Sequence, residues 1–291
     1  MTINSTGDTR APMVLRILQF PLVRVPLLGG VLFLGMGISN GFRINYAGTP
    51  PAALALMALM VALAFAVYAV FVRFVERRPV IELSLGGMGG EIGRGLLLGF
   101  GLYTTCILVL MLLGVYRING INSGLLLLPM LPMAISSGVF EELIHRGVVF
   151  RVLEEYLGSW IALAAASLFF GLRHLGNEDA TLRGALFITV EAGVLLAAAF
   201  MLTRRLWLAM GFHVSWNYAQ AAVFSGNVSG VEMPPGLIAN SIEGPDLLTG
   251  GRFGVEASLV AFLFCTATGI ALLLMAARRG RILLPPWSRT S

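Results

Sequence analysis

Long uncharged stretches alternate with short polar segments along most of the chain. Five stretches contain no charged residue, at residues 25–42, 52–72, 95–116, 118–140 and 257–277. Three more, at 159–175, 182–203 and 206–225, are apolar with a few polar positions. Each is near the length of about 20 residues that an α-helix needs to cross a bilayer. Strands of a barrel would instead alternate with period two. The pattern therefore predicts eight transmembrane helices.

The composition agrees with this pattern. Hydrophobic residues make up 57% of the 291 positions and charged residues only 12%, whereas a soluble domain carries about 25% charged residues. We expect an all-α polytopic membrane protein, with residues 1–291 as a single membrane domain. Residues 226–254 are rich in Gly, Pro, Asn and Ser. They predict an ordered loop over one end of the helix bundle.

The basic residues predict a topology. All of them are arginines, and they gather in alternate connections between the expected helices. By the positive-inside rule both termini are cytoplasmic. The arginines on this side are Arg10, Arg16, Arg24, Arg73, Arg77, Arg78, Arg94, Arg151, Arg204, Arg205, Arg278, Arg279, Arg281 and Arg289.

The same arginines explain the net charge of +5. Basic flanks beside a membrane face anionic lipid, so we expect membrane lipid as a partner and no nucleic acid. The use of arginine alone, with abundant Ala, Gly and Leu, suggests a GC-rich bacterial genome. We therefore expect a multi-pass protein of a bacterial inner membrane.

Ionisable side chains inside apolar helices mark candidate sites, because each costs about 2.5 kcal/mol or more at bilayer depth. The stretch "VFEELIHRG" at 139–147 follows a long uncharged run. Glu142 and Arg146 are four residues apart and should form an ion pair on one helix face. Glu141 points about 100° away and is free to meet other helices. His145 is expected to hydrogen-bond locally.

Two later helices carry the other candidates. In "FFGLRHLGN" Phe170 and His174 are four residues apart, and in "GFHVSWNYAQ" His213 and Asn217 have the same spacing. We expect Glu141, His174, His213 and Asn217 to converge on a water molecule and a carbonyl oxygen. Glu191, alone in its helix, has no role that the sequence settles.

Two metal chemistries use the same residues. Two histidines and a glutamate form a catalytic zinc set, so Zn²⁺ held by Glu141, His174 and His213 is an alternative to a metal-free site without cofactor. Glu142 and His145 have the spacing of a di-iron motif, which requires a second such pair. The sequence has none.

These motifs resemble those of a known family. "EELIHR", "FGLRH" and "HVSWN" are similar to the EExxxR, FxxxH and HxxxN motifs of the type II CAAX prenyl endopeptidases and their bacterial relatives, the CPBP or Abi intramembrane proteases. The resemblance covers about 124–277, the expected catalytic core. It implies an endopeptidase that hydrolyses membrane-associated peptides or membrane proteins.

The resemblance also implies a role for each motif residue. Glu141 would activate a water between itself and His174, His213 and Asn217 would form an oxyanion hole, and Glu142 with Arg146 would support them. A non-catalytic membrane scaffold with the same polar core remains an alternative. The segment 150–158 mixes charged, aromatic and apolar residues like a helix end at a membrane surface. From it we expect the cavity to open toward the cytoplasmic leaflet.

Overall fold

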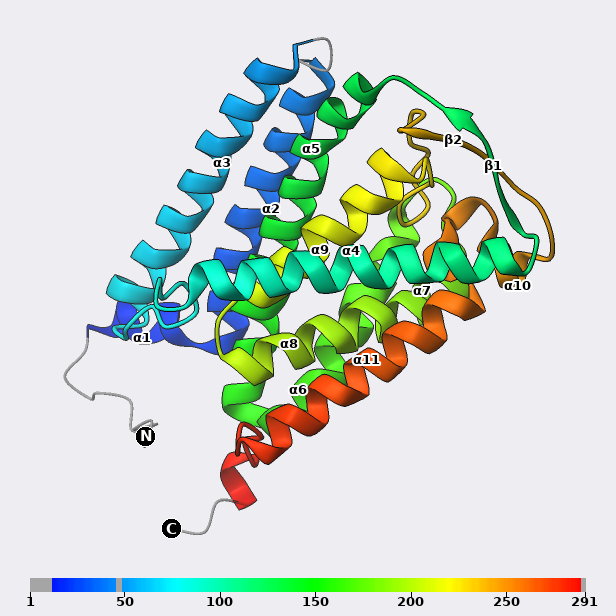
Figure 1. Ribbon diagram of the computed structural model, residues 1–291. Helices are drawn as coiled ribbons and strands as arrows, with labels where there is room; N and C mark the ends of the chain where they lie inside the picture. Colours follow the sequence, from blue (N-terminus) through cyan, green and yellow to red (C-terminus); the bar gives the residue numbers. More distant parts are fainter. Residues whose placement is uncertain (1–11, 46–48, 289–291) are drawn as a thin grey trace.

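The protein is an all-α polytopic membrane protein (Figure 1). The computed structural model describes residues 12–45 and 49–288, so Arg10 and Arg289 lie outside the described residues. Within them, six helical stretches are long and apolar enough to cross a membrane. They are Pro21–Gly41, Pro51–Val75, Met88–Leu112, Gly124–Gly176, Leu182–Thr203 and Leu259–Arg278.

All eight expected helices are present, with changed boundaries. The first three are α2 (Pro21–Asn45), α3 (Pro50–Val70) and α4 (Met88–Leu112), and a short α1 (Met13–Gln19) precedes them. The sixth comprises α7 (Leu182–Ile188), a π-helical segment Thr189–Val194 and α8 (Leu195–Thr203). The seventh is α9 (Trp207–Tyr218) with the π-helical Ala219–Val223, and the eighth is α11 (Leu259–Arg278). The seventh is too short to count among the six membrane-spanning stretches.

The prediction that the fourth helix begins at Ile118 is wrong. Residues Tyr116–Ile121 form the strand β1, which pairs antiparallel with β2 (Ile238–Ile242). Asn119, Gly120, Asn122 and Gly124 interrupt the helix pattern here, because Asn and Gly have low helix propensity. The helix starts only after Ser123, whose hydroxyl accepts a hydrogen bond from Leu125 N at 3.3 Å.

The fourth and fifth expected helices form one continuous stretch. It runs through α5 (Leu127–Ser136), the π-helical segments Ser137–Glu141 and Leu143–Phe150, and α6 (Arg151–Arg173). A kink at Gly158, with φ of 77°, divides it. A Cβ at Gly158 would lie 2.6 Å from Pro285 N, so the backbone conformation and the close contact both require glycine. Glu141 therefore lies well inside a helix and not at its end.

α8 lies in the centre of the bundle. Each of its residues from Leu195 to Leu202 is buried, and it packs against both α9 and α11. α4 approaches α9 closely through two glycines: a Cβ at Gly95 or Gly99 would lie 2.4 Å from a carbonyl oxygen of α9. Small residues that let backbones approach in this way are typical of membrane helix packing. α9 carries two of the candidate site residues, so this contact helps to position them.

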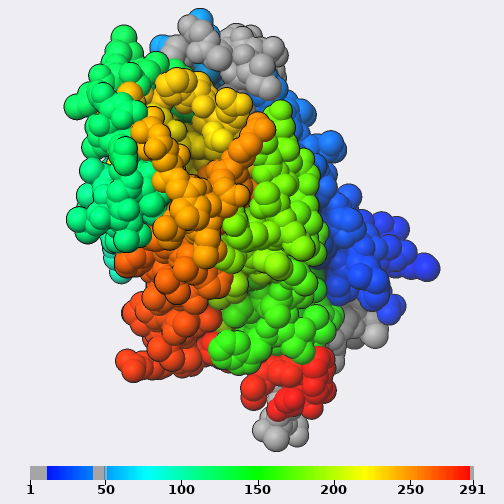
Figure 2. All heavy atoms as spheres, turned by 90° about the vertical axis from the view of Figure 1, so that its right-hand side faces the viewer, coloured from blue at the N-terminus to red at the C-terminus, as the bar shows by residue number. Residues whose placement is uncertain are grey.

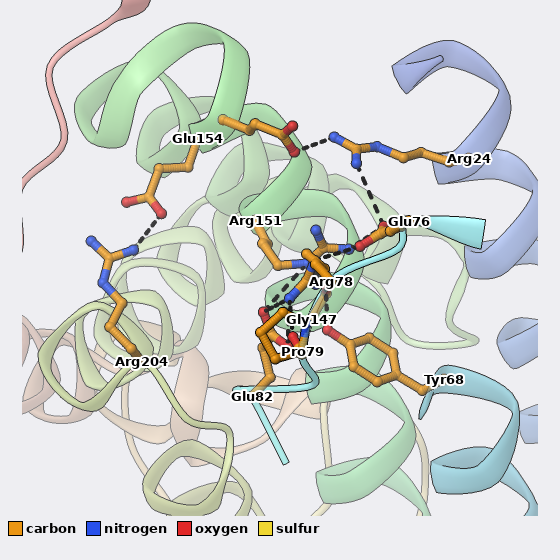
Figure 3. A network of polar contacts seen from close by, with 11 residues as sticks. Arg24, Tyr68, Glu76, Arg78, Pro79, Glu82, Gly147, Arg151, Glu154 and Arg204 are labelled. Atoms are coloured by element: carbon orange, nitrogen blue, oxygen red, sulfur yellow. Dashed lines mark hydrogen bonds and ion pairs between the residues drawn. The ribbon is translucent and has the colours of Figure 1, made fainter. Parts of the chain in front are cut away.

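One end of the bundle holds a network of ion pairs, which we call the arginine-rich end (Figure 3). Glu76, directly after the second span, accepts hydrogen bonds from Arg78 at 2.7 Å and Arg151 at 2.6 Å. Arg24 pairs with Glu155 and lies 3.6 Å from Glu76. Burial raises the pKa of Glu76, but the nearby Arg151 and Arg78 outweigh this effect and lower it overall.

The described ends of the chain also meet at the arginine-rich end. Gln19 of α1 donates to the carbonyl of Val75, and Leu283, after α11, exchanges hydrogen bonds with Ser159. The two ends are therefore on the same side, as the arginine pattern predicts. That this side is the cytoplasm remains a prediction of the positive-inside rule.

The loop 226–254 covers the opposite end, which we call the loop end. Figure 2 shows it in yellow and orange, far from the red C-terminal segment. β2 and the short α10 (Asp246–Thr249) lie in this loop, and Tyr116 donates to the carbonyl of Phe224 at 3.1 Å beside it. The loop is ordered, as its composition predicts.

Candidate active site

The structure brings Glu141, His174, His213 and Asn217 to the wall of one cavity of about 220 Å³. Glu141 comes from the long fourth helix, His174 from the turn directly after α6, and the other two from α9. Such a cavity holds several water molecules, since one water needs only about 10–15 Å³ of this volume. Residues distant in sequence thus share one small water-accessible space inside the bundle.

Glu141 has one anchored and one free carboxylate oxygen. Its Oε1 pairs with Arg173 Nη2 at 2.9 Å, and its Oε2 is buried without a partner among the described residues. The sequence analysis did not include Arg173 among the candidate residues and missed this contact. Its position directly before His174, in the last turn of the motif helix, is the signal that could have indicated it.

Glu142 links two of the motifs. Its Oε1 accepts a hydrogen bond from Arg146 Nη1 at 2.8 Å, as the spacing predicts. The same oxygen lies 2.9 Å from Nδ1 of His213. The Glu142 and Arg146 side chains are 0% and 2% exposed, so this pair is fully removed from water. The contact with His213 was not expected from the sequence.

His174 is held by the backbone of its own helix. Its Nδ1 lies 2.7 Å from the carbonyl oxygen of Phe170. A carbonyl oxygen only accepts, so Nδ1 carries the proton and Nε2 is the nitrogen available to the cavity. The ring centroids of Phe170 and His174 are 4.7 Å apart, and the ring planes are inclined by 50°, so the rings are tilted and not stacked. The guanidinium carbon of Arg146 lies 4.7 Å from the centroid of the Phe170 ring.

Asn217 is fixed by a serine from the fourth helix. Its Nδ2 donates to Ser137 Oγ at 2.9 Å, which leaves its second N–H free. Ser137 also lines the cavity. The sequence interpretation missed Ser137, which lies one helical turn before Glu141 and thus on the same face.

The two other ionisable residues noted in the sequence have different surroundings. His145 Nδ1 lies 2.8 Å from the carbonyl oxygen of Glu141, so it bonds locally, as expected, and it does not line the cavity. Glu191 lines the cavity with the four candidate residues. Its position connects it with the site.

The zinc alternative requires a cluster of metal-binding side chains. Among the described residues, no group of three or more His, Cys, Asp or Glu side chains is arranged to hold a metal ion. Nδ1 of both cavity histidines is already hydrogen-bonded, and Arg173 occupies one oxygen of Glu141. A hydrogen-bonded Nδ1 leaves Nε2 of an imidazole as a possible ligand, so the choice between a metal-free site and the zinc alternative stays a prediction.

The cavity lies toward the loop end, whereas the sequence analysis expected it to open toward the cytoplasmic leaflet, the side to which it assigned residues 150–158. None of those residues is among the cavity walls, whereas Asn40, Asn177, Val231 and Met233 are. Asn40 is 16 positions beyond Arg24 on α2, about 24 Å along the axis. Residues 150–158 lie instead at the arginine-rich end, where Arg151 and Glu155 join the ion-pair network.

One comparison with known proteins gives a match. Residues 123–219 match the family described as type II CAAX prenyl endopeptidase Rce1-like. This segment contains all three motifs and the four candidate residues. No curated protein and no solved structure matches the chain. The segment that carries the motifs is therefore similar to the Rce1-like family, which confirms the resemblance to the CPBP intramembrane proteases.

Proposed function

We propose that the protein is an intramembrane endopeptidase that hydrolyses peptide bonds with a water molecule activated by Glu141. The observation that carries this proposal is the placement of a carboxylate, two imidazoles and an amide on one cavity wall, within the region that matches the family. These groups supply a base, proton donors and hydrogen-bond donors. A hydrolase of amide bonds needs this set.

Glu141 is the general base. Its free Oε2 takes a proton from a water held between it and Nε2 of His174, while Arg173 keeps the carboxylate in place through Oε1. The resulting hydroxide attacks the peptide carbonyl carbon. The C–N bond then breaks as Glu141 returns the proton to the leaving amine. A positioned acid–base group of this kind contributes about 10²–10⁴ in rate.

His213 and Asn217 stabilise the oxyanion. Asn217 has a free N–H, because Ser137 accepts only one. His213 donates from Nε2 when its ring is doubly protonated, and the Glu142 carboxylate at Nδ1 compensates that charge. Each such donor is worth about 2.7–4 kcal/mol in acyl transfer.

Glu142 and Arg146 are positioning residues. They contact no cavity space themselves, but they tie His213 of α9 to the helix that carries Glu141. Arg146 also donates to the carbonyl oxygens of Ala192 at 2.6 Å and Gly193 at 3.1 Å. The pair therefore joins three helices around the cavity.

The substrates are peptides or membrane proteins within the bilayer, and the protein acts in the cell membrane of a bacterium. The matched family's description concerns prenylated CAAX substrates. For this chain a prenylated and a plain peptide of the same sequence, offered in parallel, test whether the lipid is required.

A non-catalytic scaffold is the second candidate function, because the same polar residues could serve as a buried core. Protein purified in detergent and incubated with a peptide library separates the two. Cleavage that is lost in Glu141→Gln supports the peptidase. Tight peptide binding without turnover in both proteins supports the scaffold.

A further inference from the structure

Glu191 is a buried carboxylate that the proposed hydrolysis does not use. It lies in the π-helical segment Thr189–Val194 and lines the same cavity as Glu141. It is only 3% exposed. Both of its carboxylate oxygens are without a hydrogen-bond partner among the described residues. π-helical segments inside α-helices are frequently functional.

The cavity offers Glu191 no free cation. Among the described residues that line it, Arg173 is the one guanidinium, and Arg173 is paired with Glu141. The two histidines in the wall are engaged through Nδ1. A carboxylate at this depth is costly and usually has a partner or a function. A cationic group from outside the described chain would supply that partner.

The backbone around Glu191 is firmly placed. Arg146 binds the carbonyls of the next two residues, Ala192 and Gly193. A Cβ at Gly193 would lie 2.9 Å from Ser167 Cβ of α6, so the two helices are in close contact there. The same arginine thus positions Glu142 for His213 and the segment that presents Glu191.

Glu256, the other extra carboxylate in the cavity wall, differs from Glu191. It accepts hydrogen bonds from the hydroxyl and the backbone N–H of Ser229 and from Trp216. These bonds attach the loop end to α9 and account for Glu256 as a structural group. They leave Glu191 as the cavity carboxylate whose two buried oxygens both lack a hydrogen-bond partner among the described residues.

We propose that Glu191 forms a specificity subsite that binds a basic side chain of the substrate, arginine in preference to lysine. Two free oxygens match the two parallel N–H bonds of a guanidinium, which is the stronger arrangement for a carboxylate. Ile188, Leu196 and Phe212 in the same wall suit the apolar stem of such a side chain. That the bound group belongs to a cleaved peptide rests on the proposed function, whereas the binding itself does not.

The test compares peptides that differ at one position. A hydrophobic peptide library in detergent carries arginine, lysine or uncharged citrulline at each position in turn, and mass spectrometry locates the cuts. At one fixed position from the cut, wild-type protein prefers arginine over citrulline by about tenfold or more in kcat/KM, mainly through KM. Glu191→Gln reduces that ratio to near one and retains cleavage of the citrulline peptide. The exposed Glu232 in the loop gives the control: Glu232→Gln keeps the preference.

A binding measurement makes the two proposals separable. The arginine and citrulline peptides, fluorescently labelled, are titrated against Glu141→Gln protein with and without Glu191→Gln. If the arginine peptide binds more tightly than the citrulline peptide and Glu191→Gln removes the difference, the subsite is supported, whether or not the wild-type protein cleaves. Absence of cleavage by the wild-type protein would refute only the peptidase proposal. If the wild-type protein cleaves the arginine and citrulline peptides with equal kcat/KM and binds them equally tightly, only the subsite proposal is refuted.

Discussion

Nδ1 of His213 lies 2.9 Å from Oε1 of Glu142, the oxygen that also accepts the hydrogen bond from Arg146 at 2.8 Å. The second glutamate of the "EELIHR" stretch is thus the residue that holds a histidine of a helix 71 residues away in sequence. The first motif and the third are joined by a direct contact. Replacement of Arg146 should therefore also affect the position of the His213 side chain.

Arg146→Ala should destabilise the protein and lower its activity. The substitution leaves Glu142 buried with His213 as its main partner and frees two carbonyl oxygens, and breaking such a buried pair costs about 3–5 kcal/mol. Thermal unfolding in detergent measures the effect. Arg94→Ala, at an exposed arginine, is the control and should unfold like wild type. An unchanged melting temperature for Arg146→Ala would mean that the pair is in contact with water.

Gly99→Ala should be far more disruptive than Gly101→Ala. A Cβ at Gly99 would lie 2.4 Å from the Phe212 carbonyl oxygen, whereas one at Gly101 meets nothing within 4 Å. α4 and α9 would have to separate, which moves His213 and Asn217. We expect a loss of about 1–3 kcal/mol for Gly99→Ala, as for overpacked cores, and little change for Gly101→Ala. Equal unfolding temperatures of the two variants would contradict the close approach of these helices.

The helices were predictable because each carries its own apolar signal. The exception is instructive: the run 118–140 is uncharged throughout, yet its residues up to Ile121 belong to strand β1, and the helix starts only after Ser123. Hydropathy reports the solvent around a segment and not its backbone conformation. The pairing of β1 with β2 joins residues more than 100 positions apart, which no local pattern shows.

The candidate site was predictable in part. Spacing of four residues correctly gave the Glu142–Arg146 pair, because both partners lie on one helix. The contacts of Arg173 with Glu141, of His213 with Glu142 and of Asn217 with Ser137 depend on how helices pack. Such contacts between helices cannot be predicted from residue spacing within one helix. The position of the cavity toward the loop end was missed for the same reason.

Access to the cavity can be tested by thiol labelling. Val231 lies in the cavity wall near the loop end, and Leu85, in the connection near the arginine-rich end, is 73% exposed. Each is replaced by cysteine in turn. By the positive-inside rule, a membrane-impermeant thiol reagent should label Leu85→Cys only from the cytoplasmic side and Val231→Cys only from the other side. Both native cysteines are free, and Cys265 lines the same cavity, so Cys106 and Cys265 are replaced by serine before the labelling. Labelling of both variants from one side would exclude this topology.

Chelation distinguishes the metal-free mechanism from the zinc alternative. If Glu141 acts directly on water, prolonged dialysis against a chelator should leave cleavage unchanged, and elemental analysis should find zinc well below one ion per chain. The zinc mechanism predicts loss of activity on dialysis and recovery on addition of zinc alone. Recovery with zinc would overturn the assignment of Glu141 as base.

The most direct test of the central claim is the rate of peptide cleavage by purified wild-type, Glu141→Gln and His174→Ala proteins in liposomes, with folding checked by thermal unfolding. Glu141→Gln keeps the shape of the side chain and removes the base. We predict that wild-type protein cleaves a membrane-embedded peptide and that each variant, still folded, is slower by about 10²-fold or more. A folded Glu141→Gln protein that cleaves at the wild-type rate would contradict the proposed mechanism.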